Sequence, residues 1–202
     1  MIIINNFIKQ FSSIINTGLS PMPWEITNNL TNILFAHIGE LDANYEIIEN
    51  VAIHKTAVVE QNVILKGPII VKEDCFIGAN SYLRGGVFLD KSVKIGANCE
   101  IKQSIVCSGS SIAHFNFLGN SIIGHRVNFE AGAVTANHYN ERLDKMISVF
   151  YQSKVIPTFI EKFGALVGDD SKIGANSVLS PGTILPPSSI VKRLQLIQQL
   201  EL

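Results

Sequence analysis

Charge is scarce in this sequence, and neither sign of charge dominates. Asp, Glu, Lys and Arg make up only 16% of the 202 residues, and the net charge is −1. A protein that binds nucleic acid carries a basic surface, so we expect no nucleic-acid partner. A surface this poor in charge instead indicates that part of it is covered by partner subunits.

Long apolar runs and a disulfide framework are missing as well. The apolar start of the chain, MIIINNFIKQFSSII, is interrupted by Asn, Lys and Gln, so we expect neither a signal peptide nor a membrane-spanning helix. The three cysteines, Cys75, Cys99 and Cys107, do not have the pattern of a disulfide scaffold. As buried reduced thiols they favour a cytoplasmic protein.

What the sequence does contain is a repeat of six residues. An aliphatic residue recurs every six positions, whereas a helix requires apolar spacings of three and four and a lone strand requires a spacing of two. A period of six is typical of the hexapeptide repeat of a parallel β-helix, in which three repeats form one triangular coil and the coils pair about 4.8 Å apart. The repeated positions are Ile53, Val59, Leu65, Val71, Ile77, Leu83, Leu89, Ile95 and Ile101, and Cys107 and Ala113 continue the series.

The repeat predicts an all-β solenoid over residues 46–191. A loop over residues 137–163 interrupts it, and the apolar residues of that loop argue against a disordered insertion. Within the loop, residues 145–151 have the pattern of a strand. After the loop the repeat returns at Val167 and continues to Leu185.

Helices are expected at both ends of the solenoid. Residues 4–15 and 23–41 carry apolar side chains at helical spacing, which predicts a helical cap over residues 1–45 that covers the open end of the β-helix. Residues 192–202 are predicted to form a short helix over the last coil. No Gly-rich phosphate loop precedes the repeat, so we expect no full nucleotide-binding domain here.

Stacking of the coils brings together residues that are 18 positions apart. Lys66, Arg84 and Lys102 should therefore form a basic column, which suits a phosphate or pyrophosphate. The alternative is a solvated basic face without a ligand. The same spacing places His114 in a column with two glycines, Gly78 and Gly96, which predicts an open groove beside the histidine.

The repeat changes at His114. Ala113 to Ile123 spans ten positions where two hexads need twelve, and a shortened corner re-aims its side chains. A lone histidine is more often structural than catalytic. An outward histidine beside the break and near the basic column is nevertheless a candidate general base, because imidazole titrates near neutral pH.

Two motifs carry a family resemblance. HFNFLGNSIIG followed by VNFEAGAVTAN, within residues 114–137, resembles the acetyltransferase domain of bifunctional N-acetylglucosamine-1-phosphate uridylyltransferase/glucosamine-1-phosphate acetyltransferase. FGALVGDDSKIGANSVLSPGT, residues 163–183, resembles archaeal-type sugar-1-phosphate nucleotidylyltransferases with a β-helix tail. The resemblance covers residues from about 50 to 190 and does not extend to the sugar-nucleotide transferase domain of those enzymes.

The resemblance implies a fold and an activity. The fold is a left-handed parallel β-helix, although crossovers between parallel strands usually run right-handed. The assembly is a homotrimer with its sites between subunits. The activity is N-acetylation of an amino sugar phosphate or sugar nucleotide, with acetyl-CoA as cosubstrate.

Roles are carried over onto matching positions. The resemblance places His114 on the general base and Arg84 and Lys102 on the ligands of the sugar phosphate. It places Phe117 and Asn128 on sugar contacts, and Phe117 stands where the family has a tyrosine. The acetyl-CoA contacts fall on Ala131, Asn137, His138 and Ala175. Ala175 replaces a serine and His138 a tyrosine, so polar contacts worth on the order of 1 kcal/mol each are lost.

Two alternatives stay open. One is a non-catalytic β-helix that binds a sugar nucleotide, or that assembles or regulates a sugar-1-phosphate nucleotidylyltransferase. The other is a zinc site between subunits, as in the γ-class carbonic anhydrases. The histidines, which are His37, His54, His114, His125 and His138, lack the paired close spacing that such a site needs, so we predict no metal.

Overall fold

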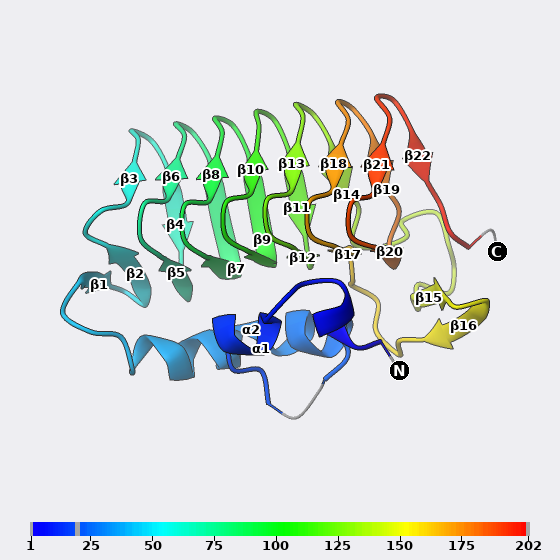
Figure 1. Cartoon of the computed structure of the whole chain (residues 1–202), viewed down its shortest axis with the longest axis horizontal. Helices are drawn as coiled ribbons and strands as arrows, with labels where there is room; N and C mark the ends of the chain where they lie inside the picture. The colour runs from blue at the N-terminus through cyan, green and yellow to red at the C-terminus, as the bar shows by residue number, and fades with distance from the viewer. Residues whose placement is uncertain (1, 19–20, 201–202) are drawn as a thin grey trace.

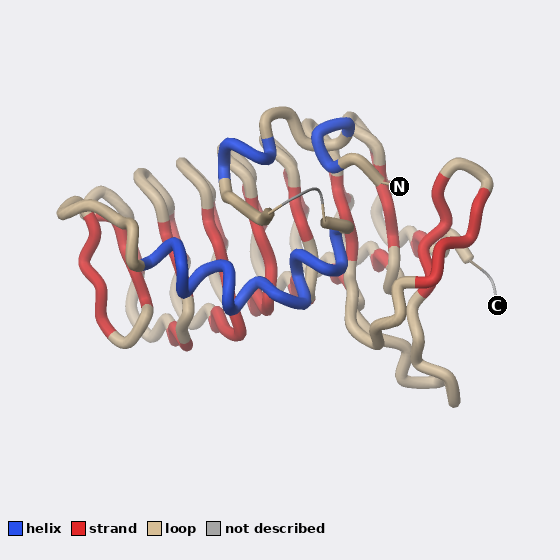
Figure 2. The backbone as a smooth tube through the Cα atoms, turned by 90° about the horizontal axis from the view of Figure 1, so that it is seen from below, coloured by secondary structure: helices blue, strands red, loops and turns tan. Residues whose placement is uncertain are grey.

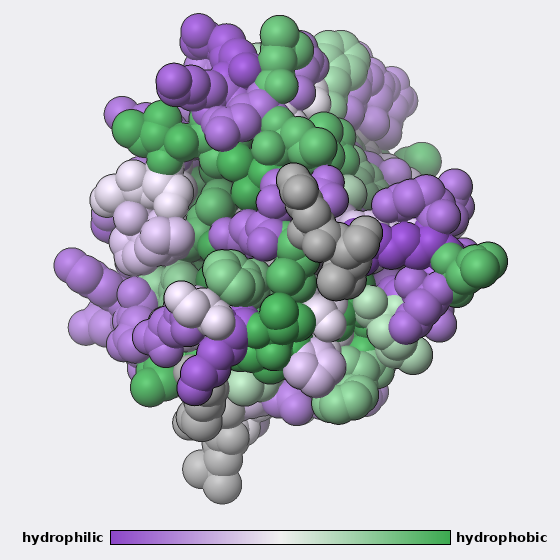
Figure 3. All heavy atoms as spheres, turned by 90° about the vertical axis from the view of Figure 1, so that its right-hand side faces the viewer, coloured by the Kyte–Doolittle hydropathy of each residue, from purple (hydrophilic) through white to green (hydrophobic). Residues whose placement is uncertain are grey.

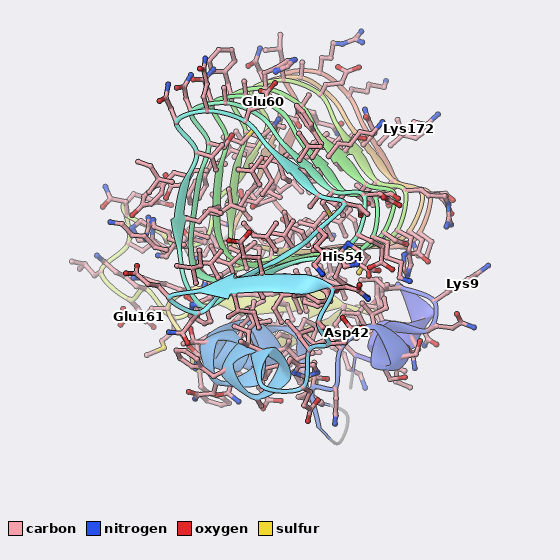
Figure 4. All side chains as sticks on the ribbon, turned by 90° about the vertical axis from the view of Figure 1, so that its left-hand side faces the viewer. Lys9, Asp42, His54, Glu60, Glu161 and Lys172 are labelled. Atoms are coloured by element: carbon pink, nitrogen blue, oxygen red, sulfur yellow. The ribbon has the colours of Figure 1, made fainter. Side chains whose placement is uncertain are left out.

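The computed structural model describes residues 2–18 and 21–200, and it shows a parallel β-solenoid of about eight turns (Figure 1). This architecture is consistent with the left-handed β-helix that the resemblance implies. Viewed along its axis, the solenoid has a triangular cross-section with three faces (Figure 4). Inward aliphatic side chains fill the triangle along its whole length.

Three sets of stacked parallel strands make up the faces. The first face consists of β3 (Val58–Val59), β6 (Phe76–Ile77), β8 (Lys94–Ile95), β10 (Ser111–Ile112), β13 (Asn128–Phe129), β18 (Lys172–Ile173) and β21 (Ile190–Val191). The second face consists of β4 (Ile64–Lys66), the first halves of β7 (Tyr82–Leu89) and β9 (Glu100–Val106), β11 (Phe117–Gly119), β14 (Val134–Thr135), β19 (Val178–Leu179) and β22 (Leu196–Ile197). The third face consists of β2 (Val51–His54), β5 (Ile69–Val71), the second halves of β7 and β9, β12 (Ile122–Ile123), β17 (Ala165–Val167) and β20 (Thr183–Leu185).

The predicted phase of the repeat is confirmed up to Ile101, is wrong at Cys107 and Ala113, and is confirmed again from Val167 to Leu185. Leu83 pairs with Ile101, 18 positions on, but Leu89 pairs with Val106, which is only 17 positions on. The inward residues are therefore Val106 and Ile112, and not Cys107 and Ala113. A bulge in β7 absorbs the missing residue. Its Gly85 and Gly86 have positive φ angles, which glycine adopts without strain.

The repeat thus shortens on either side of His114 and not at it. Ile101 to Val106 and Leu118 to Ile123 each span five positions instead of six. Both of these five-residue segments form the corner between the second and the third face. We call this corner the variable corner, and we call the corner between the first and second faces the His114 corner.

The helices lie along the third face, and not over the open end as predicted. Helix α2 (Pro23–Ile38) runs along the solenoid beside β5, β7 and β9 (Figure 2). The outward side chains of the third face are apolar, and they pack with α2 in a second buried cluster that includes Leu30, Leu34, Phe88 and Ile105. The helix covers this face because it would otherwise expose an apolar sheet to water.

Of the two predicted helices, only the second is long. Residues 4–15 form a 3₁₀ turn, η1 (Ile4–Asn6), and a four-residue helix, α1 (Phe11–Ile14), separated by Gln10 in the left-handed conformation. Asp169 fixes this segment to the solenoid, since its N–H donates to Phe7 O at 2.9 Å and its carboxylate accepts the N–H of Lys9 at 3.0 Å.

The predicted C-terminal helix is wrong. Residues 192–200 continue the solenoid, and β22 pairs in parallel with β19 through Val178–Leu196 and Leu179–Ile197. The apolar residues of this segment fit one more coil, and the neighbouring coil supplies the strand partner. Residues 201 and 202 of the prediction lie outside the described residues. Figure 3 looks at this end of the molecule, where apolar side chains reach the surface between polar ones.

The inserted loop is folded, as its apolar residues predicted. It carries the antiparallel hairpin of β15 (Ser148–Tyr151) and β16 (Lys154–Pro157), which confirms the strand expected within residues 145–151. Ile147, Val149 and Phe163 are fully buried. At the other end of the solenoid, β1 (Tyr45–Ile48) pairs antiparallel with β2. Within the described residues, no helix has the length and apolar character needed to cross a membrane.

Candidate active site

The basic column forms as predicted. Lys66 of β4 pairs with Arg84 of β7, which pairs with Lys102 of β9, so all three lie on neighbouring coils of the second face. The Lys66 ammonium and the Arg84 guanidinium lie 5.2 and 5.4 Å from the centre of the Tyr82 ring. The aromatic ring stabilises both cations in this position.

One carboxylate and a fourth cation complete the column, and neither was predicted from the sequence. Both Nε and Nη2 of Arg84 donate to Oε1 of Glu100, at 2.9 and 2.6 Å. The pKa of Lys102 lies below its usual value, first because the ammonium is partly buried, and then because Lys162 and Arg84 repel it. Lys162 comes from the end of the inserted loop. An anion at this place would relieve the repulsion between the three cations.

The predicted groove beside His114 is wrong. A Cβ on Gly96 would lie 2.8 Å from Ala113 O, and a Cβ on Gly78 would lie 2.6 Å from Ala97 N, so neighbouring backbone fills the space above each glycine. His114 lies one position later in its repeat than expected, because the five-residue segment from Ile101 to Val106 shifts the phase of the repeat by one residue. Its counterparts are Gln61 on the first coil, Arg193 on the last coil, and alanines on the coils between them, Ala79, Ala97, Ala131 and Ala175.

On the inner coils of this corner, His114 is thus the one large exposed side chain among alanines. Its carbonyl oxygen accepts the N–H of Gly132 at 2.9 Å and the Nδ2–H of Asn116 at 3.2 Å, which fixes the backbone. Its ring makes no hydrogen bond to another of the described residues. Figure 4 shows this corner at Glu60, on the side of the triangle away from α2.

The structure brings His114, Phe117 and Lys102 to one side of the molecule. Phe117 follows the His114 corner on β11 and pairs with Glu100, the partner of Arg84. Gly119 of the same strand pairs with Lys102. Substrate contacts predicted on the second face therefore share one surface with the candidate base.

Asn128 lies on the first face, on the other side of the His114 corner. It is exposed on β13, beside Glu130. Glu130 accepts hydrogen bonds from Arg193 at 2.7 Å and from the N–H of Ala175 at 2.9 Å. An open depression of about 450 Å³ lies over Asn128, Glu130 and Lys172.

The four predicted coenzyme contacts divide between two corners. Ala131 and Ala175 lie on the His114 corner, in the coils that follow His114. Asn137 and His138 lie on the variable corner, where the inserted loop begins. Asn137 is buried and its Nδ2 donates to Asn120 Oδ1 at 2.7 Å, whereas His138 is exposed. A single chain therefore does not bring the four residues together.

Metal ligands are not clustered in the part of the chain that the structure describes. No group of three or more His, Cys, Asp or Glu side chains lies close enough there to hold an ion.

Two protein families match the sequence. The GMPPB C-terminal domain matches residues 47–139, and the hexapeptide repeat of succinyl-transferase matches residues 160–185. Together these segments cover most of the coils described above.

Curated relatives match over a longer stretch. The chain is 34% identical over 160 residues to a bifunctional sugar-1-phosphate nucleotidylyltransferase/acetyltransferase of Sulfurisphaera tokodaii, which covers 76% of this chain and 39% of the relative. It is 32% identical over 152 residues to the bifunctional protein GlmU of Methanocaldococcus jannaschii (66% and 36%), and 33% identical over 156 residues to that of Methanococcus vannielii (75% and 37%). The chain thus spans less than two fifths of the length of these relatives.

The chain therefore carries a hexapeptide-repeat domain. More particularly, it is homologous to the C-terminal half of the GlmU-type bifunctional sugar-1-phosphate nucleotidylyltransferase/acetyltransferases.

Proposed function

We propose that this protein transfers an acetyl group from acetyl-CoA to the amine of an amino sugar phosphate or sugar nucleotide, such as glucosamine 1-phosphate. The observation that carries the proposal is the position of exposed His114 beside the second face, where Arg84, Lys102 and Lys162 gather positive charge. The name of the Sulfurisphaera relative includes an acetyltransferase activity. A phosphate held by the cations would direct the sugar amine toward the corner.

The chain offers both groups that amide formation requires. The imidazole of His114 is the base that takes the proton when the amine nitrogen attacks the thioester carbonyl carbon. The C–N bond forms, the carbonyl oxygen becomes negative, and the C–S bond then breaks. The proton held by His114 passes to the departing thiolate, so the histidine returns to its neutral form.

A backbone N–H on the same corner is available to the oxyanion. The N–H groups of Ala79 and Ala175 donate to the carboxylates of Glu60 and Glu130, at 2.8 and 2.9 Å. The N–H of Ala131, one coil from His114, donates to no acceptor among the described residues. We assign it to the developing negative charge, where a preorganised donor lowers the barrier.

A complete site requires a second copy of the chain. The two pairs of coenzyme contacts lie on different corners of one subunit, and a homotrimer would bring the His114 corner of one subunit against the variable corner of the next. The second face offers exposed apolar side chains for such contacts, including Ile64 and Leu196, which are 54% and 58% exposed in the single chain. The three buried free cysteines favour the cytoplasm as its location.

The test is release of free CoA from acetyl-CoA in the presence of amino sugars and their 1-phosphates. His114→Ala should lower turnover by about 10²- to 10⁴-fold with unchanged circular dichroism, since general bases contribute factors of that size. His54→Ala, on β2 in the first coil, is the control and should keep full activity. Equal turnover in wild type and His114→Ala would mean that another residue is the base.

A second candidate is a β-helix that binds a sugar nucleotide or assembles a nucleotidylyltransferase without catalysis. The hydrogen bond from the Asn137 side-chain amide to Asn120 favours this second candidate, because that amide is not available to a coenzyme in this conformation. Calorimetric titration separates the two candidates. Binding of a sugar nucleotide without any binding of CoA or acetyl-CoA at millimolar concentration would support the second one.

A further inference from the structure

The residue that follows His114 has an unusual backbone conformation for its type. Phe115 has a φ angle of 58°, in the left-handed region, and its side chain is 65% exposed. A bulky side chain in this region is strained, and the strain persists only where the surrounding structure imposes it. An exposed aromatic ring gains little from packing that would offset the strain.

The other coils show what this position normally requires. The equivalent residues on the His114 corner all have positive φ angles, and most are asparagine, which tolerates the left-handed region. These residues are Asn62, Asn80, Asn98, Gly132, Asn176 and Leu194. The corner itself therefore does not need an aromatic side chain. The coil that carries His114 has one nonetheless.

We propose that Phe115 is a substrate-positioning residue whose ring forms an apolar wall for the acceptor sugar beside His114. The inference rests on the proposed function and extends it to a residue on the specificity side of the site. Phe115 lies between His114 and the second face, which carries Phe117 and the basic column. The cations would hold the phosphate end of the acceptor, and the ring would contact the C–H face of the sugar and exclude water from the amine.

The substitution Phe115→Asn tests this, because it installs the residue that most other coils use. Relief of backbone strain should raise the unfolding midpoint by about 2–4 °C, the shift that corresponds to ~1 kcal/mol in a protein of this size. Loss of the ring should raise KM for glucosamine 1-phosphate about tenfold and leave KM for acetyl-CoA unchanged. Phe115→Tyr keeps the ring and should keep the acceptor KM.

Leu194→Asn is a matched control on the same corner. Leu194 has a φ angle of 60° and is 79% exposed, but it lies in the last coil, away from His114. Its replacement should also raise the unfolding midpoint while both KM values stay at the wild-type level. A gain in stability would then be separated from any effect on the acceptor.

Each of the following results would overturn the inference. A lower unfolding midpoint in Phe115→Asn would show that the ring is held by packing, and a changed oligomeric state would show that it belongs to a subunit interface. An unchanged acceptor KM would show that the ring does not touch the sugar. If the wild-type protein shows no turnover, the proposed acetyl transfer fails, and the dissociation constant for glucosamine 1-phosphate, measured by calorimetry, then replaces KM. Absence of that binding overturns the inference as well.

Discussion

Removal of the Lys102 charge should stabilise the free protein and weaken its hold on phosphate. Lys102 lies one strand spacing, about 4.8 Å, from Arg84, and burial and Lys162 add to the unfavourable environment. Two unit charges about 5 Å apart repel by ~1 kcal/mol in water and ~3 kcal/mol at an effective dielectric constant of 20. Because this ammonium is largely solvated and Glu100 offsets part of the Arg84 charge, we expect a net gain near ~1 kcal/mol for Lys102→Met.

That gain corresponds to a rise in the unfolding midpoint of about 2–4 °C at low salt, and it should shrink at high salt because the repulsion is screened. The effect on the ligand has the opposite sign. A lost charge-assisted hydrogen bond is worth ~1.5–3 kcal/mol, so the dissociation constant for glucosamine 1-phosphate should rise about 10- to 150-fold. Thermal unfolding with and without the sugar phosphate measures both effects in one experiment.

Lys94→Met is the matched control for this prediction. Lys94 is an exposed lysine on β8 of the first face. Its neighbours on the two adjacent coils are Phe76 and Ser111. Its replacement should change neither the unfolding midpoint nor the affinity for phosphate appreciably. A destabilised Lys102→Met variant, or one that binds the sugar phosphate as well as wild type, would refute the account of the basic column.

Three further predictions follow from buried groups. Burial, and then Glu73, raise the pKa of Tyr45 to about 12, so the folded state favours the protonated phenol. The free energy of unfolding should therefore fall as pH rises from about 10 toward 12. The urea midpoint of Tyr45→Phe should fall less over the same pH range than that of wild type. Burial likewise raises the pKa of Cys75 to about 12, and all three thiols are buried, so a thiol reagent should label none of them before unfolding and all 3 after it. Asn137→Ala should cost ~1–3 kcal/mol in unfolding free energy, because Asn120 Oδ1 loses its buried partner, while His138→Ala should be neutral.

The sequence predicted the basic column because the repeat is regular where the column lies. From Ile53 to Ile101 the coils have equal length, so arithmetic on residue numbers was enough to place Arg84 between Lys66 and Lys102. After Ile101 the phase was lost for a physical reason. Val106 and Cys107 are both apolar, one facing the solenoid core and the other the cluster under the N-terminal segment, so the pattern could not show which was inward.

Other errors had the same origin in contacts distant in sequence. Lys162 reaches Lys102 only because the inserted loop folds back on the solenoid, and no spacing rule connects the two. The last segment is apolar at intervals that suit a helix, but the exposed edge of β19 offers it a strand partner. Helix α2 was predicted in place and length, whereas the face that it covers depended on the outward side chains of the third face.

All changes of coil length in this solenoid fall on one corner. The two five-residue segments, the β7 bulge that compensates for the first of them, and the inserted loop all lie between the second and third faces. Each described turn of the other two corners keeps six positions from one inward residue to the next. In an ordinary sheet, a one-residue deletion turns every later side chain over and disrupts the core. Here the same deletion is absorbed at the variable corner, so evolution or a designer can lengthen, shorten or replace this edge, next to Lys102, without rebuilding the interior.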